Sequence, residues 1–310
     1  MQVSPAVNER VQISVASLVR LNQAGSNLPL DARRVQARQS GDYQSPFKGR
    51  GMEFDESRPY QPGDDIRNID WRVTARTGRT HTKLFREERE RPVFLWVDLR
   101  APMFFATRGR YKSVLAAHMA SLLGWSAVYH GDRVGAVIFS DDMHYELKPQ
   151  RGKAAVLRLI KQMVRIPAWD GQFKPQSGAE AGVRALLRLH RVARPGSLIF
   201  LLSDFRRLDD HIETELLRLS RHSDLVLVFI HDRLETELPP AGIYRVSDGA
   251  QEWLLDTWDR SRTEEYQRRF RDHVERLERL ARRRGIYLIQ CGTSDDPFAA
   301  LQTGLVTGRP

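Results

Sequence analysis

Two aspartates that each follow a strongly apolar segment are the residues of this sequence best placed for chemistry. Asp98 ends the run FLWVD, and Asp204 follows the run LIFLLS. Such runs are typical of buried strands in a parallel sheet, and ligands usually bind at the carboxyl ends of those strands. We therefore expect both carboxylates at one edge of a sheet. There they suit a hard divalent cation such as magnesium, unless each caps a helix or pairs with an arginine.

The common motifs of enzymes and cofactor sites do not occur in the sequence. The segment RGKAAV around Lys153 lacks the first glycine and the hydroxyl residue of a phosphate-binding loop, and GRGMEF lacks the third glycine of a dinucleotide-binding loop. GWSAV does not match the G-x-S-x-G motif, and neither H-E-x-x-H nor a cysteine pair is present for zinc. We therefore expect no catalytic residue, no cofactor and no enzyme activity. A hydrolase with a triad built from distant residues has the least support.

A second concentration of functional groups lies in the run FDESRPYQPGDDIRNIDWRVTAR, which ends at Arg76. Its PGDD segment is a turn signal. Arginines and carboxylates at this density suit bidentate ion pairs. Two interpretations stay open, a network of ion pairs that braces the fold and a surface that docks a partner. The residues concerned are Arg58, Tyr60, Gly63, Asp64, Asp65, Arg67, Asp70, Trp71, Arg72 and Arg76.

The elements that must position these residues alternate between strand and helix from residue 92 onward. Strands are predicted at 93–97, 134–139, 144–147, 198–202, 225–230 and 286–290, helices at 111–129, 153–164, 179–192, 210–220, 260–284 and 297–305, and a hairpin at 243–255. This alternation predicts an α/β fold with a doubly wound, mostly parallel sheet covered by helices on both faces.

Three segments are expected along the chain. Residues 1–45 are predicted to hold a helix at 11–21 and a linker, and residues 92–310 to form the sheet domain. Between them, residues 46–91 are dense in charge, glycine and aromatic residues and have little helical period. They are predicted to form a small loop-and-strand module that includes a strand at 82–85.

The chain is basic, with a formal net charge of +10. The segment 260–284 holds ten arginines and five acids, so it contributes half of that excess. Apolar residues at helical spacing indicate that one face of this predicted helix packs on the core. Its arginines either pair with acids three or four residues away or form a basic docking face. Binding of nucleic acid is less favoured, because no recognisable reading motif accompanies the charge.

Composition also bears on the cellular setting. No apolar run reaches the roughly 18 to 20 residues of a membrane span, and the first residues lack the pattern of a signal peptide. Cys291 is the only cysteine, so an internal disulfide is excluded. A reducing, cytoplasmic setting is therefore expected.

The run from Phe54 to Arg76 resembles the signature of the bacterial domain-of-unknown-function-58 family. The resemblance continues through FREERERPVFLWVD, YKSVLAAHMASLLGWSAVYHGDRVGAVIF, GSLIFLLSDF, ELPPAGIYRVSDG and TSDDPFAAL. It implies a sheet domain similar to von Willebrand factor A domains, with a ligand-binding upper edge. Genes of this family commonly neighbour genes for MoxR-type AAA+ ATPases, which implies an adaptor or co-chaperone role. Many members carry two N-terminal membrane spans, and this sequence shows neither.

The resemblance also implies what Asp98 would hold. In von Willebrand factor A domains a metal-ion-dependent adhesion site uses D-x-S-x-S after the first strand, and a later aspartate that corresponds here to Asp204. The two serine positions fall on Arg100 and Pro102, and Ser203 precedes the later aspartate. Arginine has no lone pair for a metal and a permanent positive charge. We therefore expect a degenerate site in which Arg100 replaces the cation by pairing with Asp98 and Asp204.

The same site uses a threonine from a later loop. The aligned region here is PQSGAEAGVRAL, which offers Ala179 or Glu180 at that position and Ser177 as the nearest hydroxyl. The hydroxyl ligands that complete a magnesium shell are therefore mostly missing.

The resemblance and the residues together predict a non-enzymatic adaptor that partners a MoxR-type AAA+ ATPase. Its candidate surfaces are the run 58–76 and the upper edge of the sheet. Two alternatives are kept. The first is a metal-dependent adaptor that uses magnesium at Asp98 and Asp204. The second is electrostatic binding of nucleic acid or an anionic surface through the helix at 260–284.

Overall fold

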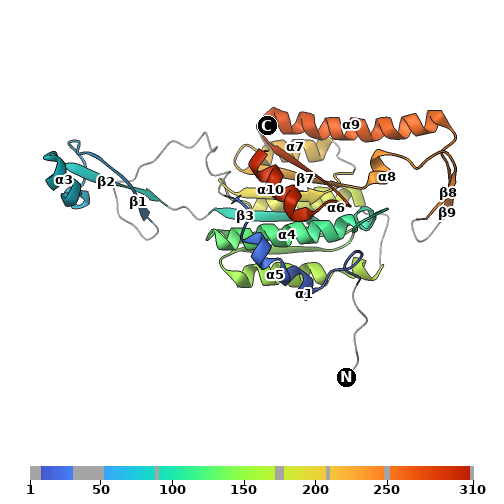
Figure 1. Cartoon of the computed structure of the whole chain (residues 1–310), viewed down its shortest axis with the longest axis horizontal. Coiled ribbons are helices and arrows are strands. Elements are labelled where there is room, and N and C mark those ends of the chain that lie inside the picture. The colour runs from blue at the N-terminus through green and yellow to red at the C-terminus, as the bar shows by residue number, and fades with distance from the viewer. Residues whose placement is uncertain are drawn as a thin grey trace, which may run out of the picture. The chain divides into compact units, whose positions relative to one another are not determined.

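The computed structural model describes residues 8–30, 52–87, 91–171, 178–206, 210–247 and 252–307 (Figure 1). The chain divides into two compact units, one of residues 1–32 with 91–310 and one of residues 33–90. Residues 31–45 of the predicted linker lie outside the described residues, whereas its first part is described and contains the short helix Asn22–Gly25.

The larger unit is built on a six-stranded sheet with the order β10-β7-β6-β3-β4-β5. Adjacent strands are parallel, except that β5 is antiparallel to β4. The strands are β3 (Pro92–Asp98), β4 (Arg133–Phe139), β5 (His144–Gln150), β6 (Leu198–Ser203), β7 (Asp224–His231) and β10 (Tyr287–Gly292). After β5 the chain returns to the other side of β3, so the winding reverses between β3 and β6. Ligands bind at this kind of position in open α/β sheets.

Helices cover both faces of this sheet, which confirms the predicted α/β fold with a mostly parallel sheet (Figure 1). One face carries α1 (Val15–Arg20), α2 (Asn22–Gly25), α4 (Lys112–Tyr129), α5 (Lys153–Val164) and α10 (Pro297–Thr307). The other carries α6 (Gly178–Val192), α7 (Asp210–Leu219) and α9 (Arg260–Arg284). Two short 3-10 helices, Ala101–Met103 and Pro167–Asp170, lie in loops.

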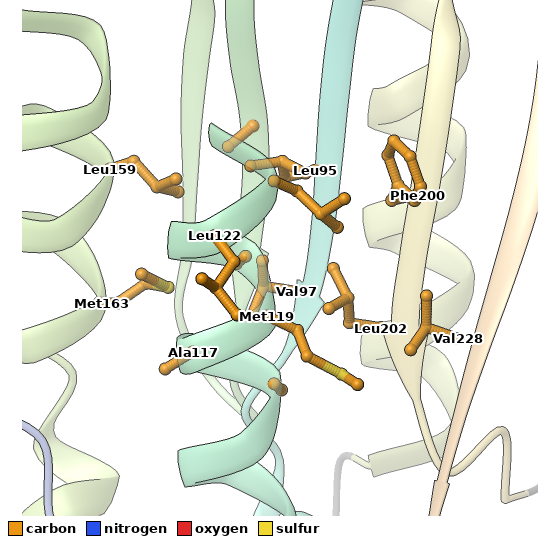
Figure 2. Packing of buried hydrophobic residues seen from close by; sticks show 14 of the residues in the cluster. Leu95, Val97, Ala117, Met119, Leu122, Leu159, Met163, Phe200, Leu202 and Val228 are labelled. Carbon is orange, nitrogen blue, oxygen red and sulfur yellow. The ribbon is translucent and has the colours of Figure 1, made fainter. Parts of the chain in front are cut away.

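The helix α4 occupies the centre of its face and is buried along nearly its whole length. Met119 and Leu122 of α4 lie against Leu95 and Val97 of β3 (Figure 2). Burial of each such side chain stabilises the fold by about 1.5–3 kcal/mol. A helix that is apolar on all sides requires cover on all sides. Because α4 is packed on all sides, its first residue, Lys112, is held in a fixed place beside the sheet.

Two smaller elements complete the larger unit. The helix α8 (Arg233–Thr236) follows β7, and β8 (Ile243–Ser247) pairs with β9 (Glu252–Asp256) as a separate antiparallel hairpin. The helix α9 has the predicted bounds, and its apolar stripe packs on the sheet through residues that include Leu277 and Ala281. None of the described helices combines the length and apolar character of a membrane span.

The smaller unit contains an antiparallel pair, β1 (Met52–Pro59) and β2 (His81–Glu87), together with a 3-10 turn at Ile66–Asn68 and the helix α3 (Trp71–Thr77). The carboxylate of Asp70 accepts hydrogen bonds from the first backbone N–H groups of α3, and Gly78 ends the helix in the left-handed conformation. The sequence predicts the strand near residues 82–85 but neither β1 nor α3. A seven-residue helix spans only two turns, which is too short for a helical period to show.

Candidate functional site

The carboxyl ends of four neighbouring strands each deliver one aspartate. These residues, called the carboxyl edge below, are Asp98 at the end of β3, Asp141 after β4, Asp204 after β6 and Asp232 after β7. Each is at most 4% exposed. A buried carboxylate is unfavourable unless it is paired or accepts hydrogen bonds, so the partners of each one decide what the edge can do.

Asp98 is paired by Arg100, two residues further along the chain. The guanidinium donates to both carboxylate oxygens, from Nε to Oδ1 at 2.9 Å and from Nη2 to Oδ2 at 2.5 Å. The backbone N–H of Arg100 adds a hydrogen bond at 3.1 Å, and the Ser203 hydroxyl donates to Oδ2 at 2.6 Å. The structure thus brings together Asp98, Arg100 and Ser203 of the predicted site.

The guanidinium of Arg100 is itself buried, beside the ring of Phe139 with Cζ 5.6 Å from the ring centroid. Burial alone would lower the pKa of Arg100, but the charge of Asp98 and its hydrogen bonds outweigh burial and raise it. A permanent positive charge therefore lies between the strands at the place where the resemblance predicts a magnesium ion.

Asp204 pairs with a different cation, the ammonium of Lys112 at the start of α4. Lys112 is 0% exposed, and its Nζ donates to Asp204 Oδ2 and to Glu235 Oε1, both at 2.7 Å. Arg206 also forms ion pairs with Asp204 and Glu235. Burial would raise the pKa of Asp204, but the charge and hydrogen bond of Lys112 lower it below its usual value. The expectation that Arg100 serves both aspartates therefore missed Lys112 as a direct partner of Asp204.

The remaining two carboxylates hold backbone segments in place. Asp232 caps α8 and accepts hydrogen bonds from the hydroxyls of Thr107 at 2.7 Å and Thr293 at 2.6 Å. These bonds lower its pKa although burial opposes them. Asp141 accepts a hydrogen bond of 2.8 Å from the backbone N–H of Ala101, and burial raises its pKa. Both aspartates connect loops across the edge.

The carboxyl edge does not fit a magnesium ion. The ion needs a nearly octahedral shell of oxygens with free lone pairs. Guanidinium and ammonium groups instead occupy Asp98 and Asp204, and the Ser203 hydroxyl donates to Asp98 and accepts from the backbone N–H of Phe205. Of the threonine-loop positions, Glu180 is exposed and pairs with Arg184, and Ser177 lies outside the described residues. Within the described ranges, no group of three or more His, Cys, Asp or Glu residues is arranged to hold a metal.

The same contacts weigh against a nucleophile at this edge. A catalytic serine needs a neighbouring base that accepts its proton. The Ser203 hydroxyl donates to Asp98, a carboxylate already held by a permanent cation. His273 contacts the backbone carbonyl of Asp204 at 3.0 Å, and burial lowers its pKa. Neither side chain has the geometry of an activated pair.

In the smaller unit, three acids of the signature run, Asp64, Asp65 and Asp70, bind internal partners. Asp64 accepts both Nη groups of Arg58, at 2.7 and 2.9 Å, and the backbone N–H of Gln61. Asp65 caps the 3-10 turn. Asp70 caps α3 and accepts the hydroxyl of Ser57 at 2.8 Å. Backbone hydrogen bonds are the main reason that the pKa values of Asp64 and Asp70 are lowered.

Two further signature positions shape this unit rather than carry charge. The backbone N–H of Tyr60 donates to the carbonyl of Thr80 at 2.9 Å, which extends the pairing of β1 with β2. Gly63 adopts a φ of 108°, which residues other than glycine rarely adopt, and this conformation closes the PGDD turn.

Other residues of the same run face solvent. Trp71 is 69% exposed and Ile66 is 66% exposed, and the side chains of Arg67, Arg72 and Arg76 are exposed as well. These five residues are called the arginine face below. Within the described side chains of the signature run, Arg58 and three acids brace the unit, whereas three arginines around two large apolar side chains face outward.

Sequence reasoning missed Lys112, Glu235 and Asp232. A signal for Lys112 does exist, because a lone lysine begins the otherwise apolar segment KSVLAAHMASLLGW. A cation is unfavourable in the first turn of a helix, where the helix dipole is positive. A buried lysine there requires an acidic partner. The strand-end position of Asp232 after LVLVFIH is the same signal that identified Asp98 and Asp204.

Comparisons with known proteins agree with the signature. The family model described as "Protein of unknown function DUF58" matches residues 56–292. Uncharacterized proteins of Mycobacterium bovis and Mycobacterium tuberculosis are 30% identical over 207 residues, which are 65% of this chain and 62% of each relative. The chain therefore spans less than two thirds of the length of these relatives.

One solved structure is also similar. The crystal structure of an uncharacterized membrane spanning protein from Vibrio fischeri is 17% identical and covers 68% of this chain and 94% of that chain. The TM-score is 0.20, which is too low to support an argument about the fold.

Proposed function

The chain belongs to the DUF58 family, a family of unknown function, and we propose that it is a non-enzymatic interaction protein with a von Willebrand factor A-like sheet domain. In this proposal its partner is a MoxR-type AAA+ ATPase, and the chain acts as an adaptor in the assembly or maturation of a protein complex. The order of the sheet supports the von Willebrand factor A-like domain. The resemblance of the signature run supports the partner.

The observation that carries this proposal is the pairing at the carboxyl edge. An adhesion site of the metal-dependent kind keeps one coordination position open for a carboxylate of its partner. Here Arg100 and Lys112 lie beside the two carboxylates that would hold the ion, and their two positive charges equal the charge of one magnesium ion. A buried, internally paired edge has no open position. The edge therefore serves as a structural centre, and binding takes place elsewhere on the chain.

The metal-dependent and electrostatic alternatives have less support. The first requires free carboxylates at Asp98 and Asp204. The second requires free arginines on α9, yet most of the arginines described there form ion pairs. Arg269, Arg279 and Arg282 each pair with a glutamate four residues earlier. Arg276 and Arg283 pair with acids of α7. This helix is stabilised by its own charge pattern.

The direct test is binding of the full chain to the MoxR-type ATPase encoded nearest to its gene. Isothermal titration calorimetry is carried out with nucleotide-free ATPase, with and without a chelator, so that chelation acts on this chain alone. We expect a complex whose Kd does not change on chelation. Absence of a complex at tens of micromolar would contradict the proposal. A complex that chelation and Asp98→Ala both abolish would establish the metal-dependent alternative instead.

A further inference from the structure

The arginine face is not explained by the stability of the unit that carries it. The helix α3 has no buried residue, and Trp71 at its first position is mostly exposed. A small unit gains little from a large aromatic side chain in solvent, and exposed apolar side chains within a polar rim mark interaction sites. In helical geometry, Trp71, Arg72, Ala75 and Arg76 fall within one arc, and all four are exposed.

The charges of this face are also unfavourable for the isolated unit. Arg72 and Arg76 are four residues apart on a helix, a spacing at which like charges repel each other. Among the described residues, no ion pair or side-chain hydrogen bond involves the guanidinium groups of Arg67, Arg72 or Arg76. Asp64, Asp65 and Asp70 bind inside the unit, through Arg58, Ser57 and backbone N–H groups. These three cations therefore face solvent, and no acid within the described part of the unit pairs with them.

The helix α9 shows what the same residue type does when its role is structural. There, glutamates four residues before Arg269, Arg279 and Arg282 neutralise them. On α3 the residue four positions before Arg76 is Arg72, and the residue four positions before Arg72 is Asn68, so neither arginine has an acid at this spacing. Arg268 and Arg271 of α9 also lack an ion pair among the described residues, but on α3 both arginines lack one and share an arc with the exposed Trp71. This combination points to charges that are neutralised by another molecule.

We infer that the arginine face docks an acidic protein surface with an apolar recess that receives Trp71. Tryptophan and arginine are the side chains most enriched among residues that dominate binding energy, and a charged rim around an apolar centre is typical of protein interfaces. Complementary charge speeds encounter and fixes orientation. This inference rests on the proposed function, in which the AAA+ ATPase supplies the acidic surface.

The composition of the face favours a protein over a nucleic acid. Phosphate contacts need only cations and hydrogen-bond donors, and a stacking site needs only the indole of Trp71. Ile66 and Ala75 add exposed aliphatic surface beside these groups. Aliphatic surface gains from contact with an apolar side chain of a partner, which phosphates and sugars do not provide.

The first experiment locates the partner of the face. The full chain is expressed in its own host with the photoreactive amino acid p-benzoylphenylalanine in place of Trp71, and cross-linked peptides are identified by mass spectrometry. Leu254 on the β8–β9 hairpin is a matched control, because it is 70% exposed and apolar but lies on the other unit. We expect the probe at position 71 to cross-link to an acidic segment of the ATPase and the probe at 254 not to do so.

The second experiment tests the charge complementarity. Arg67→Glu, Arg72→Glu and Arg76→Glu are combined, and Arg72→Glu alone serves if the triple variant is less well folded by circular dichroism. Arg268→Glu with Arg271→Glu is the control, because these α9 arginines are exposed and have no ion pair among the described residues. We expect at least a tenfold loss of affinity for the first set and less than a twofold loss for the control. Acid-to-arginine changes in the cross-linked segment should restore binding to the reversed face.

The outcomes separate this inference from the proposed function. Position 71 could instead cross-link to an acidic segment of another protein, with binding lost on charge reversal of the face and restored by acid-to-arginine changes in that segment. This result supports the inference and contradicts the ATPase as partner. Binding to the ATPase that is unaffected by the charge reversals supports the proposed function and overturns the inference. Cross-linking of position 71 to nucleic acid, to a basic protein segment or to nothing overturns the inference as well.

Discussion

The carboxyl edge with its buried cations, and the signature run that carries the arginine face, both contain aspartates and basic side chains, but in opposite arrangements. At the carboxyl edge, Arg100 and Lys112 are buried against Asp98 and Asp204, and no side chain of this group is left for an external ligand. In the signature run, Asp64, Asp65 and Asp70 bind inside the unit, and the arginines of the arginine face point outward. The difference shows that charged residues in a signature have a role that depends on where their partners lie. Paired and buried charges hold the fold, whereas unpaired exposed charges are available for recognition.

The strongest test of this contrast is removal of the buried lysine. Lys112→Met leaves Asp204 and Glu235 without their shared cation in a buried site, apart from Arg206 at the margin. We expect a loss of about 3–5 kcal/mol in the free energy of unfolding, measured by urea denaturation followed by circular dichroism. Lys153→Met, at the exposed start of α5, is the control and should change stability by less than about 0.5 kcal/mol. A loss under about 1 kcal/mol at position 112 would refute a structural role for the edge.

Arg100→Ser is expected to have a smaller effect. It restores the serine of the D-x-S pattern but removes the guanidinium from a buried carboxylate. Asp98 keeps the hydroxyl of Ser203 and the backbone N–H of residue 100, so we expect a loss of about 2–3 kcal/mol rather than the full value of a broken pair. Arg184→Ser, which breaks only an exposed ion pair on α6, should cost less than about 0.5 kcal/mol. Equal losses for the two variants would show that the Asp98 pair does not stabilise the fold.

The pH dependence of Asp204→Asn sharpens the same comparison. The pKa of Asp204 is lowered in the folded chain, so its ionised form stabilises the fold above the unfolded value of about 3.9. This contribution is lost as the pH falls through the folded pKa. The difference in unfolding free energy between wild type and Asp204→Asn should therefore be constant from pH 5 to pH 7 and shrink below about pH 4. The pKa of His273 depends partly on the charge of Asp204, so His273→Gln is introduced into both proteins, and the other histidines with lowered pKa values cancel in this difference. A difference that grows on acidification would contradict the assignment.

Changes on the arginine face should have the smallest effect on stability. Trp71→Ala removes a mostly exposed side chain, so we expect the unfolding free energy to change by less than about 0.5 kcal/mol. Affinity for the partner should fall about 30-fold, equivalent to about 2 kcal/mol. Trp258→Ala, at a tryptophan that is 68% exposed on the other unit, is the control for both measurements. If Trp71→Ala strongly destabilises the chain and leaves the affinity for the partner unchanged, the arginine face has a structural role and not a binding role.

Much of the fold could be predicted because the elements of the larger unit are long and have clear patterns. The helices α5 and α9 have the predicted bounds, since both show a clear apolar stripe and α9 is followed by a glycine that ends it. The predicted helix at 11–21 is shorter in the structure, where Ser14 caps α1 and Val15 begins it. The smaller unit was less predictable, because β1 contains an irregular register near Phe54 and α3 is too short for periodicity.

The site was predictable only where its partners are close in sequence. Asp98 and Arg100 are two residues apart, so their pairing can be proposed from the D-L-R segment alone. Lys112 lies 92 residues from Asp204 and 123 residues from Glu235, and only the fold brings these three together. Exposure on the arginine face was equally hidden, because the sequence cannot show which charges of a mixed run turn inward.

The central claim is that the chain's own cations have replaced a metal ion at the carboxyl edge. It is tested most directly by thermal unfolding of the purified chain across a magnesium titration from zero to 10 mM. We predict that the melting temperature does not change with magnesium, because Arg100 and Lys112 already occupy the two carboxylates. A saturable rise in melting temperature that is lost in Asp98→Ala would contradict the claim.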